Sequence, residues 1–177
     1  MVMAMAKSAD TTRNGAIAGA AAALVWAATE PLDKPIFRCS YSDVEFLGKA
    51  VTRGPKWRAI GLVMHLANGA LFGAIYANVR DRLAGPGVAR GITAGMVEHL
   101  LSWPGVAVAD KLHPARDQLV TMKGNSNAFR QATWRHLLFG AALGIFEERL
   151  NAPQAEQPVQ APTEPAAAAS GAEPSAA

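Results

Sequence analysis

Glutamate and histidine stand next to each other at positions 98 and 99, inside the otherwise apolar stretch GMVEHLLSWPG (95–105). Imidazole titrates near neutral pH and binds metal ions, and a desolvated carboxylate can titrate in the same range, so such a pair could move protons or hold an ion. Histidines also occur in two other apolar stretches, as His65 and His136. We expect one internal polar cluster, made of Glu30, His65, Asn68, Glu98, His99 and His136.

Four apolar stretches position these residues: 15–29, 59–79, 88–109 and 132–146. The second and third match the roughly 20 residues that a helix needs to cross a bilayer, and the first and fourth are shorter. Half of the 177 residues are apolar and only 18% are charged, which is unusual for a soluble core. The sequence therefore predicts an all-α fold, an integral membrane four-helix bundle. A soluble Ala-rich helical protein is the alternative.

The predicted transmembrane domain covers residues 15–150, between two segments of different composition. Residues 1–14 form a polar N-terminal segment. The Glu30-Pro31 that follows the first apolar stretch lacks the small residues of a signal-peptide cleavage site, so we expect a retained helix. Residues 151–177 consist largely of Pro, Ala, Gln and Glu, with a single valine. This composition buries too little apolar surface to offset the entropy of ordering and predicts a disordered tail.

Each of the three histidines lies on a row of glycines spaced four residues apart, so imidazole and glycines share one face of a helix. In lipid, small residues mark the places where helix backbones approach each other closely. The imidazoles should therefore point at neighbouring helices, in one half of the bundle. The same glycine rows could also join copies of the chain into a homo-oligomer. The expected helix-packing glycines are Gly15, Gly19, Gly61, Gly69, Gly73, Gly91, Gly95, Gly140 and Gly144.

Three functions are open for the polar cluster. The favoured one is structural or regulatory, without catalysis, in which neutral histidines bond to Asn68, Glu98 and backbone carbonyls as packing groups. The second is a component of proton or ion transport that uses the histidines with Glu30 and Glu98. The third is a bound haem or metal, although no Cys pair and no His-Glu-x-x-His motif occurs. The candidate metal ligands are His65, His99 and His136.

The basic residues give no sign of nucleic-acid binding. The net charge is +3, and Lys and Arg stand singly between apolar segments instead of forming a dense run with aromatic residues. That distribution suits loops beside a lipid bilayer, which is the expected partner. Cys39 is the only cysteine, so the chain cannot form an internal disulfide.

A shift of 77 residues superimposes several residues of the first half on the second. The match suggests a tandem repeat of two helix pairs, with coincidence in a low-complexity chain as the alternative. Trp-Arg pairs at helix ends suit the headgroup level of a bilayer, so we expect those of this repeat to be anchors. The superimposed residues are Trp26 on Trp103 and Trp57-Arg58 on Trp134-Arg135.

The two longer loops carry further signals. Ser42-Asp43-Val44-Glu45 fits a capping box and predicts a short amphipathic helix along the membrane interface. In the other loop, His113 precedes Pro114 and is expected to be an exposed residue.

Small residues and single histidines follow a fixed order over about residues 14–150. The order is Gly15-x3-Gly19 with Trp26 and Glu30-Pro31, then His65 with Phe72-Gly73 and Tyr76, then Gly91-x3-Gly95 with His99 and Trp103-Pro104, and last His136. This order resembles the YagU-like family of bacterial inner-membrane proteins. The resemblance implies a multi-pass protein of the bacterial inner membrane and assigns no catalytic residue.

Overall fold

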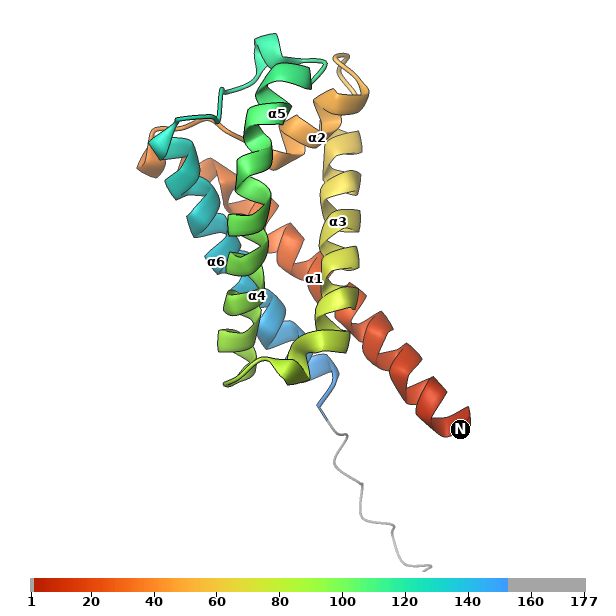
Figure 1. Cartoon of the computed structure of the whole chain (residues 1–177). Coiled ribbons are helices and arrows are strands. Elements are labelled where there is room, and N and C mark those ends of the chain that lie inside the picture. Colours follow the sequence, from red (N-terminus) through yellow and green to blue (C-terminus); the bar gives the residue numbers. More distant parts are fainter. Residues whose placement is uncertain (1, 153–177) are drawn as a thin grey trace, which may run out of the picture.

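The computed structural model describes residues 2–152, and within that range the chain is helical without any strand (Figure 1). The prediction of an all-α fold is confirmed. From residue 153 on, the predicted tail lies outside the described residues. The α-helices are α1 (Val2–Phe37), α2 (Asp43–Val51), α3 (Trp57–Val79), α4 (Gly87–Ser102), α5 (Val106–Leu112) and α6 (Ser126–Leu150), with 3-10 turns at Arg80–Arg82, Trp103–Gly105 and Arg116–Gln118.

Local signals start and stop several of these helices. Ser42 Oγ accepts a hydrogen bond from the backbone N–H of Glu45 at 3.2 Å, so the predicted cap of α2 is confirmed. Asn125 caps α6 in the same way, and Gly124 before it adopts a φ of 75°, which glycine reaches without strain. Pro104 has no backbone N–H, and the chain between α4 and α5 forms a 3-10 turn there.

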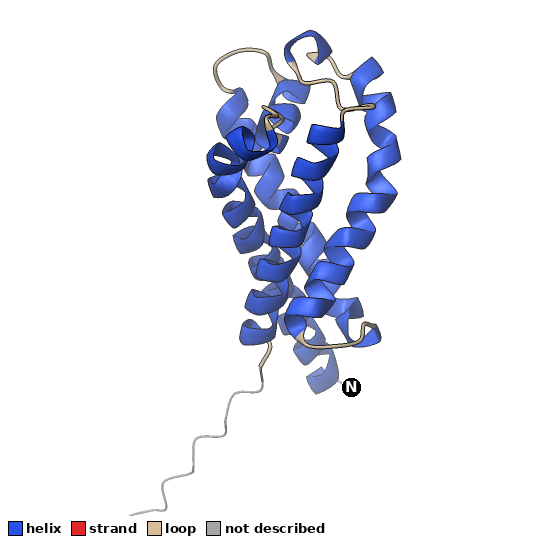
Figure 2. Cartoon of the chain, turned by 90° about the vertical axis from the view of Figure 1, so that its left-hand side faces the viewer, coloured by secondary structure: helices blue, strands red, loops and turns tan. Residues whose placement is uncertain are grey.

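The four long helices pack as two pairs joined through α1. Helix α1 packs against α3 and also against α6, and α4 packs against α6 (Figure 1). The short helices α2 and α5 lie at the end of the molecule opposite to the N-terminus, where α2 packs on α3 (Figures 1 and 2). Helices α3 and α4 face each other without forming a closely packed pair.

Glycines allow the two pairs to pack backbone against backbone. A Cβ atom added to Gly19 of α1 would lie 2.0 Å from the carbonyl oxygen of Gly69 on α3. In the second pair, a Cβ atom on Gly91 of α4 would lie 2.1 Å from the carbonyl oxygen of Gly140 on α6. Real Cβ atoms essentially never approach other atoms so closely. Both interfaces therefore depend on the missing side chain.

The two glycine interfaces repeat each other with a shift of 71 to 72 residues instead of 77. The Gly19–Gly69 contact corresponds to the Gly91–Gly140 contact. His65 precedes Gly69 by four residues, just as His136 precedes Gly140. The residues matched by a shift of 77 occupy different places, since Trp57 opens α3 whereas Trp134 lies in the third turn of α6.

Two single-residue expectations are wrong. Arg135, expected as an anchor at the headgroup level, is completely buried, while its neighbour Trp134 is 46% exposed. His113, expected to be exposed, is 7% exposed because it tethers its loop to α2. Its Nε2 donates to the carbonyl oxygen of Phe46 at 3.0 Å, and its Nδ1 accepts from the N–H of Ala115 at 3.1 Å.

Two helical stretches of the described chain are long and apolar enough to cross a membrane. They are residues 8–37 of α1 and residues 57–82, which include α3. The apolar window of the first stretch is 39% buried and that of the second is 28% buried. In each of these two windows, fewer than half of the residues are fully buried.

Candidate functional site

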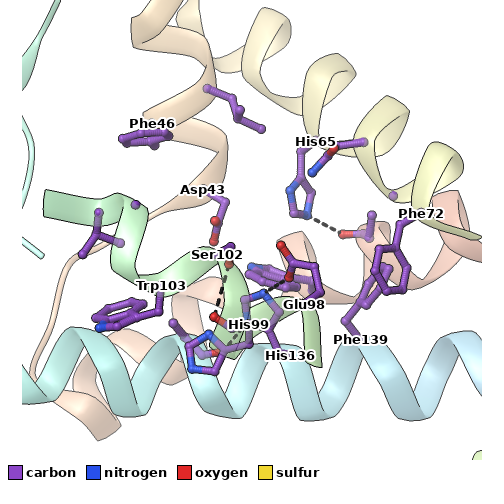
Figure 3. Close-up of a pocket in the computed structure, with 18 of the residues that line it drawn as sticks. Asp43, Phe46, His65, Phe72, Glu98, His99, Ser102, Trp103, His136 and Phe139 are labelled. Carbon is purple, nitrogen blue, oxygen red and sulfur yellow. Dashed lines mark hydrogen bonds and ion pairs between the residues drawn. The ribbon is translucent and has the colours of Figure 1, made fainter. Parts of the chain in front are cut away.

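A cavity of about 460 Å³ lies between α3 and α4 (Figure 3). Helix α2, α5 and the turn before α5 border the end of the cavity farthest from the N-terminus, and α1 and α6 contribute the wall behind it. Leu71 and Ile75 of α3 line the cavity and are 62% and 56% exposed, so the cavity reaches the outer surface of the molecule at this helix. Its aromatic lining residues are Trp26, Tyr41, Phe46, Phe72, Trp103 and Phe139.

A carboxylate and an imidazole form the polar centre of this cavity. Glu98 Oε2 lies 2.8 Å from His136 Nε2, and His136 Nδ1 donates to the carbonyl oxygen of Ala132 at 2.7 Å. Because a carbonyl only accepts, Nδ1 carries a hydrogen, and a second hydrogen must lie between Nε2 and the carboxylate. The pair therefore shares one proton between Nε2 and the carboxylate. The Glu98 side chain is 41% exposed, so that proton is accessible from the cavity.

The other two imidazoles use their Nε2 atoms as donors. His65 Nε2 donates to the carbonyl oxygen of Ala23 at 3.1 Å. His99 Nε2 lies 2.9 Å from Thr133 Oγ1. The Thr133 hydroxyl itself donates its hydrogen to the carbonyl oxygen of Phe129 at 2.8 Å. His99 is therefore the donor of that pair. Neither Nε2 atom is free to ligate a metal ion, and residues 2–152 contain no group of three His, Cys, Asp or Glu placed to hold one.

Two of the three imidazoles contact the Trp26 indole, and the third, His99, contacts the ring of His136. The ring centroid of Trp26 is 5.4 Å from that of His65 and 4.8 Å from that of His136. The rings of His99 and His136 are 4.5 Å apart. Figure 3 shows these side chains converging from α3, α4 and α6. Asn68 and Glu98 line the same cavity, so five of the six residues of the predicted cluster meet in one place.

The sixth residue, Glu30, belongs to a neighbouring ion-pair network that surrounds Arg135. Arg135 Nε lies 2.5 Å from Asp33 Oδ2, and its Nη2 lies 2.7 Å from Asp33 Oδ1. Its Nη1 lies 3.4 Å from Asp43 and 3.6 Å from Glu30. Gln131 also donates to Asp33, at 2.7 Å. Of this network, only Asp43 lines the cavity.

Tyr41 connects the network with the cavity. Its hydroxyl donates to Asp43 Oδ1 at 2.6 Å, and its ring lies 5.6 Å from the guanidinium carbon of Arg135. Burial raises the pKa of Tyr41 well above the usual value of 10, and the negative charge of Asp43 raises it further. The hydroxyl therefore stays protonated and acts as a fixed donor to Asp43.

Sequence reasoning missed most of the Arg135 network, although the sequence carries a signal for it. Gln131 and Arg135 are four residues apart and therefore share a face of α6. Asp33 follows Glu30 by three residues and shares a face of α1. Two polar faces of opposite charge at neighbouring helix ends would have predicted the pairing.

Comparison with known proteins gives no relative for this chain. No protein-family model matches it, and neither do the curated proteins or the solved structures. The resemblance to the YagU-like family stays a prediction, and the function has to be argued from the geometry.

Proposed function

We propose that this chain is a multi-pass integral membrane protein that binds a small lipophilic molecule, without catalysis, in the cavity between α3 and α4. The observation that carries the proposal is the cavity itself. Its volume of about 460 Å³ lies within the roughly 300–1,000 Å³ of small-molecule sites, and its mostly aromatic walls surround one polar pair.

The length and surface of α3 support the membrane part of this proposal. Residues 59–79 carry no Lys, Arg, Asp or Glu, and 21 helical residues span about 31 Å, close to the roughly 30 Å of a bilayer core. Val63, Leu71 and Ile75 on α3 are all more than half exposed. A core helix of a soluble protein would bury such residues. The outward apolar face suits lipid.

The charged groups stand at two separate levels of the molecule, which also supports a membrane position. At the level of the N-terminus, Arg80 of the turn after α3 pairs with Glu147 of α6, and Glu147 is 1% exposed. At the other level lies Arg135 with its carboxylates. Residues 136–146 of α6, between the two levels, contain no Lys, Arg, Asp or Glu. Exposed Trp134 lies at the second level, as expected for an interfacial aromatic residue.

The place of the opening suggests how a ligand arrives. The cavity meets the outer surface beside Leu71 and Ile75, on the apolar face of α3. A molecule dissolved in the hydrocarbon layer can enter there sideways, without leaving the lipid. Inside the cavity it would meet the polar pair of Glu98 and His136 among aromatic side chains, which favours ligands with one polar group on an apolar body.

The geometry gives less support to proton or ion transport. A relay that starts at Glu98 passes its proton to His136, whose other nitrogen bonds to the carbonyl oxygen of Ala132. The hydrogen bond of His99 leads through Thr133 to another backbone carbonyl. Both branches end on groups that cannot carry a proton onward.

A haem or metal site has equally little support. His99 and His136 are tilted against each other as neighbouring rings, and the Nε2 atoms of His65 and His99 are both donors. Ligation through the Nε2 atom of His65 or His99 would require breaking the hydrogen bond of that atom, and residues 2–152 contain no group of three His, Cys, Asp or Glu placed to hold a metal ion.

A neutral photoreactive probe tests the proposed site. The full chain in lipid vesicles is irradiated with 3-trifluoromethyl-3-phenyldiazirine, an uncharged lipid-soluble carbene precursor, and labelled peptides are mapped by mass spectrometry. We expect label on Phe139, which is 7% exposed and lines the cavity, as well as on outward-facing Leu24. Phe139 can be labelled only if a small molecule enters the cavity.

Matched tryptophan variants complete this test. Asn68→Trp fills the cavity from α3 and should reduce labelling of Phe139 several-fold, while label on Leu24 persists. Val63→Trp adds the same bulk on the outer face of α3, where Val63 is 67% exposed, and should leave Phe139 labelled. Absence of label on Phe139 in the unaltered chain would overturn the proposed function.

A further inference from the structure

Resting on the proposed function, we infer that the cavity selects amphiphilic organic cations, that is, molecules with one permanent positive charge on an apolar body. The inference combines two properties of the walls, their charge and their rings. Both are independent of the membrane-facing surface on which the proposed function depends.

Carboxylates outnumber guanidinium and ammonium groups around the cavity. Two carboxylates, those of Asp43 and Glu98, line it, and no Lys or Arg does. Arg135, the cation next to the cavity, is already occupied by Asp33, Asp43 and Glu30. An anionic ligand would therefore find no unoccupied guanidinium or ammonium partner.

The charge balance stays negative even when the Glu98–His136 pair keeps its proton. The carboxylates of the cavity and of the adjoining network belong to Glu30, Asp33, Asp43 and Glu98. Their positive partners are Arg135, a protonated His136, and Lys34, which lies 3.6 Å from Glu30. With His65 and His99 neutral, four negative charges thus face at most three positive ones. In a medium of low dielectric, an excess of one charge attracts a monovalent cation strongly.

The aromatic walls suit the same class of ligand. A cation is attracted to the face of a Trp, Tyr or Phe ring, and its apolar substituents gain by contact with the rings. One ring of the cavity already shows this behaviour, because the Tyr41 ring lies 5.6 Å from the guanidinium carbon of Arg135. Phe72 and Phe139 stack edge to face at 5.5 Å, and Trp26 lies beside Phe139 at 6.1 Å. These rings accept a bulky cation better than a bulky anion.

Two ions of the same shape and opposite charge test the inference. The full chain in neutral detergent micelles is labelled with the uncharged diazirine in the presence of tetraphenylphosphonium or of tetraphenylborate. We expect tetraphenylphosphonium to protect Phe139 at a concentration about tenfold lower than tetraphenylborate does. Equal protection by both ions, or better protection by the anion, would overturn the inference.

Three variants distinguish an effect of the Glu98 charge from an effect on folding. For each variant we compare the ratio of the protecting concentrations of the two ions, because the partition of each ion into the micelle is the same for all variants and cancels. Glu98→Gln should bring the ratio of the two protecting concentrations close to one. Glu148→Gln, the same substitution at an exposed carboxylate of the last turn of α6, should leave the ratio unchanged. His136→Gln removes the positive partner and should leave the cation preference at least as large as in the unaltered chain. Loss of the preference in both Glu98→Gln and His136→Gln would show that the intact pair matters and not the carboxylate charge, which also contradicts the inference.

The readout keeps the two proposals apart. If the diazirine labels Phe139 and tetraphenylphosphonium gives no protection, the inference about cations fails and the proposed lipophilic site stands. If the diazirine does not label Phe139 at all, the proposed function itself fails.

Discussion

The α1–α3 and α4–α6 interfaces contrast with the space between α3 and α4. In each interface two glycines, such as Gly19 and Gly69, bring backbones into contact with no room for a Cβ atom. Between α3 and α4, the aromatic rings of α1, α3 and α6 fill part of the space and leave about 460 Å³ open. The glycines hold α3 close to α1 and α4 close to α6, and the bulky rings keep α3 and α4 apart. The cavity is the space that remains between α3 and α4.

The two polar clusters show the same contrast. The Arg135 network is saturated, since a fully buried guanidinium meets three carboxylates and the carbonyl oxygen of Tyr41. The Glu98–His136 pair is only half enclosed, because 41% of the Glu98 side chain is exposed. A saturated network holds helices together and has little capacity left for a ligand. A pair that faces a cavity can exchange its partner.

The largest effect on stability is expected from a substitution in the Arg135 network. Arg135→Gln leaves two or more carboxylates buried without their cation, which should lower the free energy of unfolding by about 3–5 kcal/mol. Arg130→Gln on the same helix affects an exposed residue and should change it by less than about 0.5 kcal/mol. Thermal unfolding in detergent, followed by tryptophan fluorescence, measures both. Equal stability of the two variants would contradict the structural role of the network.

A smaller effect is expected at the glycine interfaces. Gly19→Ala places a methyl group 2.0 Å from the carbonyl oxygen of Gly69, so α1 and α3 must separate, at a cost of about 1–3 kcal/mol. Gly105→Ala is the matched control on the open side. An added Cβ there meets no atom within 4 Å, and Gly105 has a helical φ of −66°. The control should be neutral or slightly stabilising in the same unfolding measurement. If Gly105→Ala were destabilising and Gly19→Ala were not, the α1–α3 interface would not depend on the missing side chain of Gly19.

The smallest effect on stability is expected at the Glu98–His136 pair. Glu98→Gln removes a charge from a partly exposed pair, and such pairs contribute about 0–1 kcal/mol, so unfolding should change little. The substitution should nevertheless abolish the cation preference of the cavity. A stability loss as large as that of Arg135→Gln would instead assign the Glu98–His136 pair to the structural framework.

Residue spacing alone predicted most of the long helices and the helix faces that pack together. Three of the four apolar stretches, 15–29, 59–79 and 132–146, lie within single long helices, whereas 88–109 is divided between α4, a 3-10 turn and α5. Glycine rows at four-residue spacing correspond to the faces that meet in the two pairs. Rotation about a helix axis is set by sequence position, so residues four apart share a face in any fold. That is why the sequence could place His65, His99 and His136 on inward faces.

Only the tertiary structure decided which inward residues meet and which space stays open. From its position at the end of the first apolar stretch, Glu30 was expected to join the histidine cluster. In the structure α1 packs against α6, and Glu30 lies beside Arg135 instead. Arg135 itself looks like a surface anchor until Asp33 and Asp43 are brought to it from segments about a hundred residues away. The cavity depends on α3 and α4 both packing on other helices and not on each other. Such partner choice is a property of the whole packing arrangement, because each helix offers several faces and the total of all contacts selects among them.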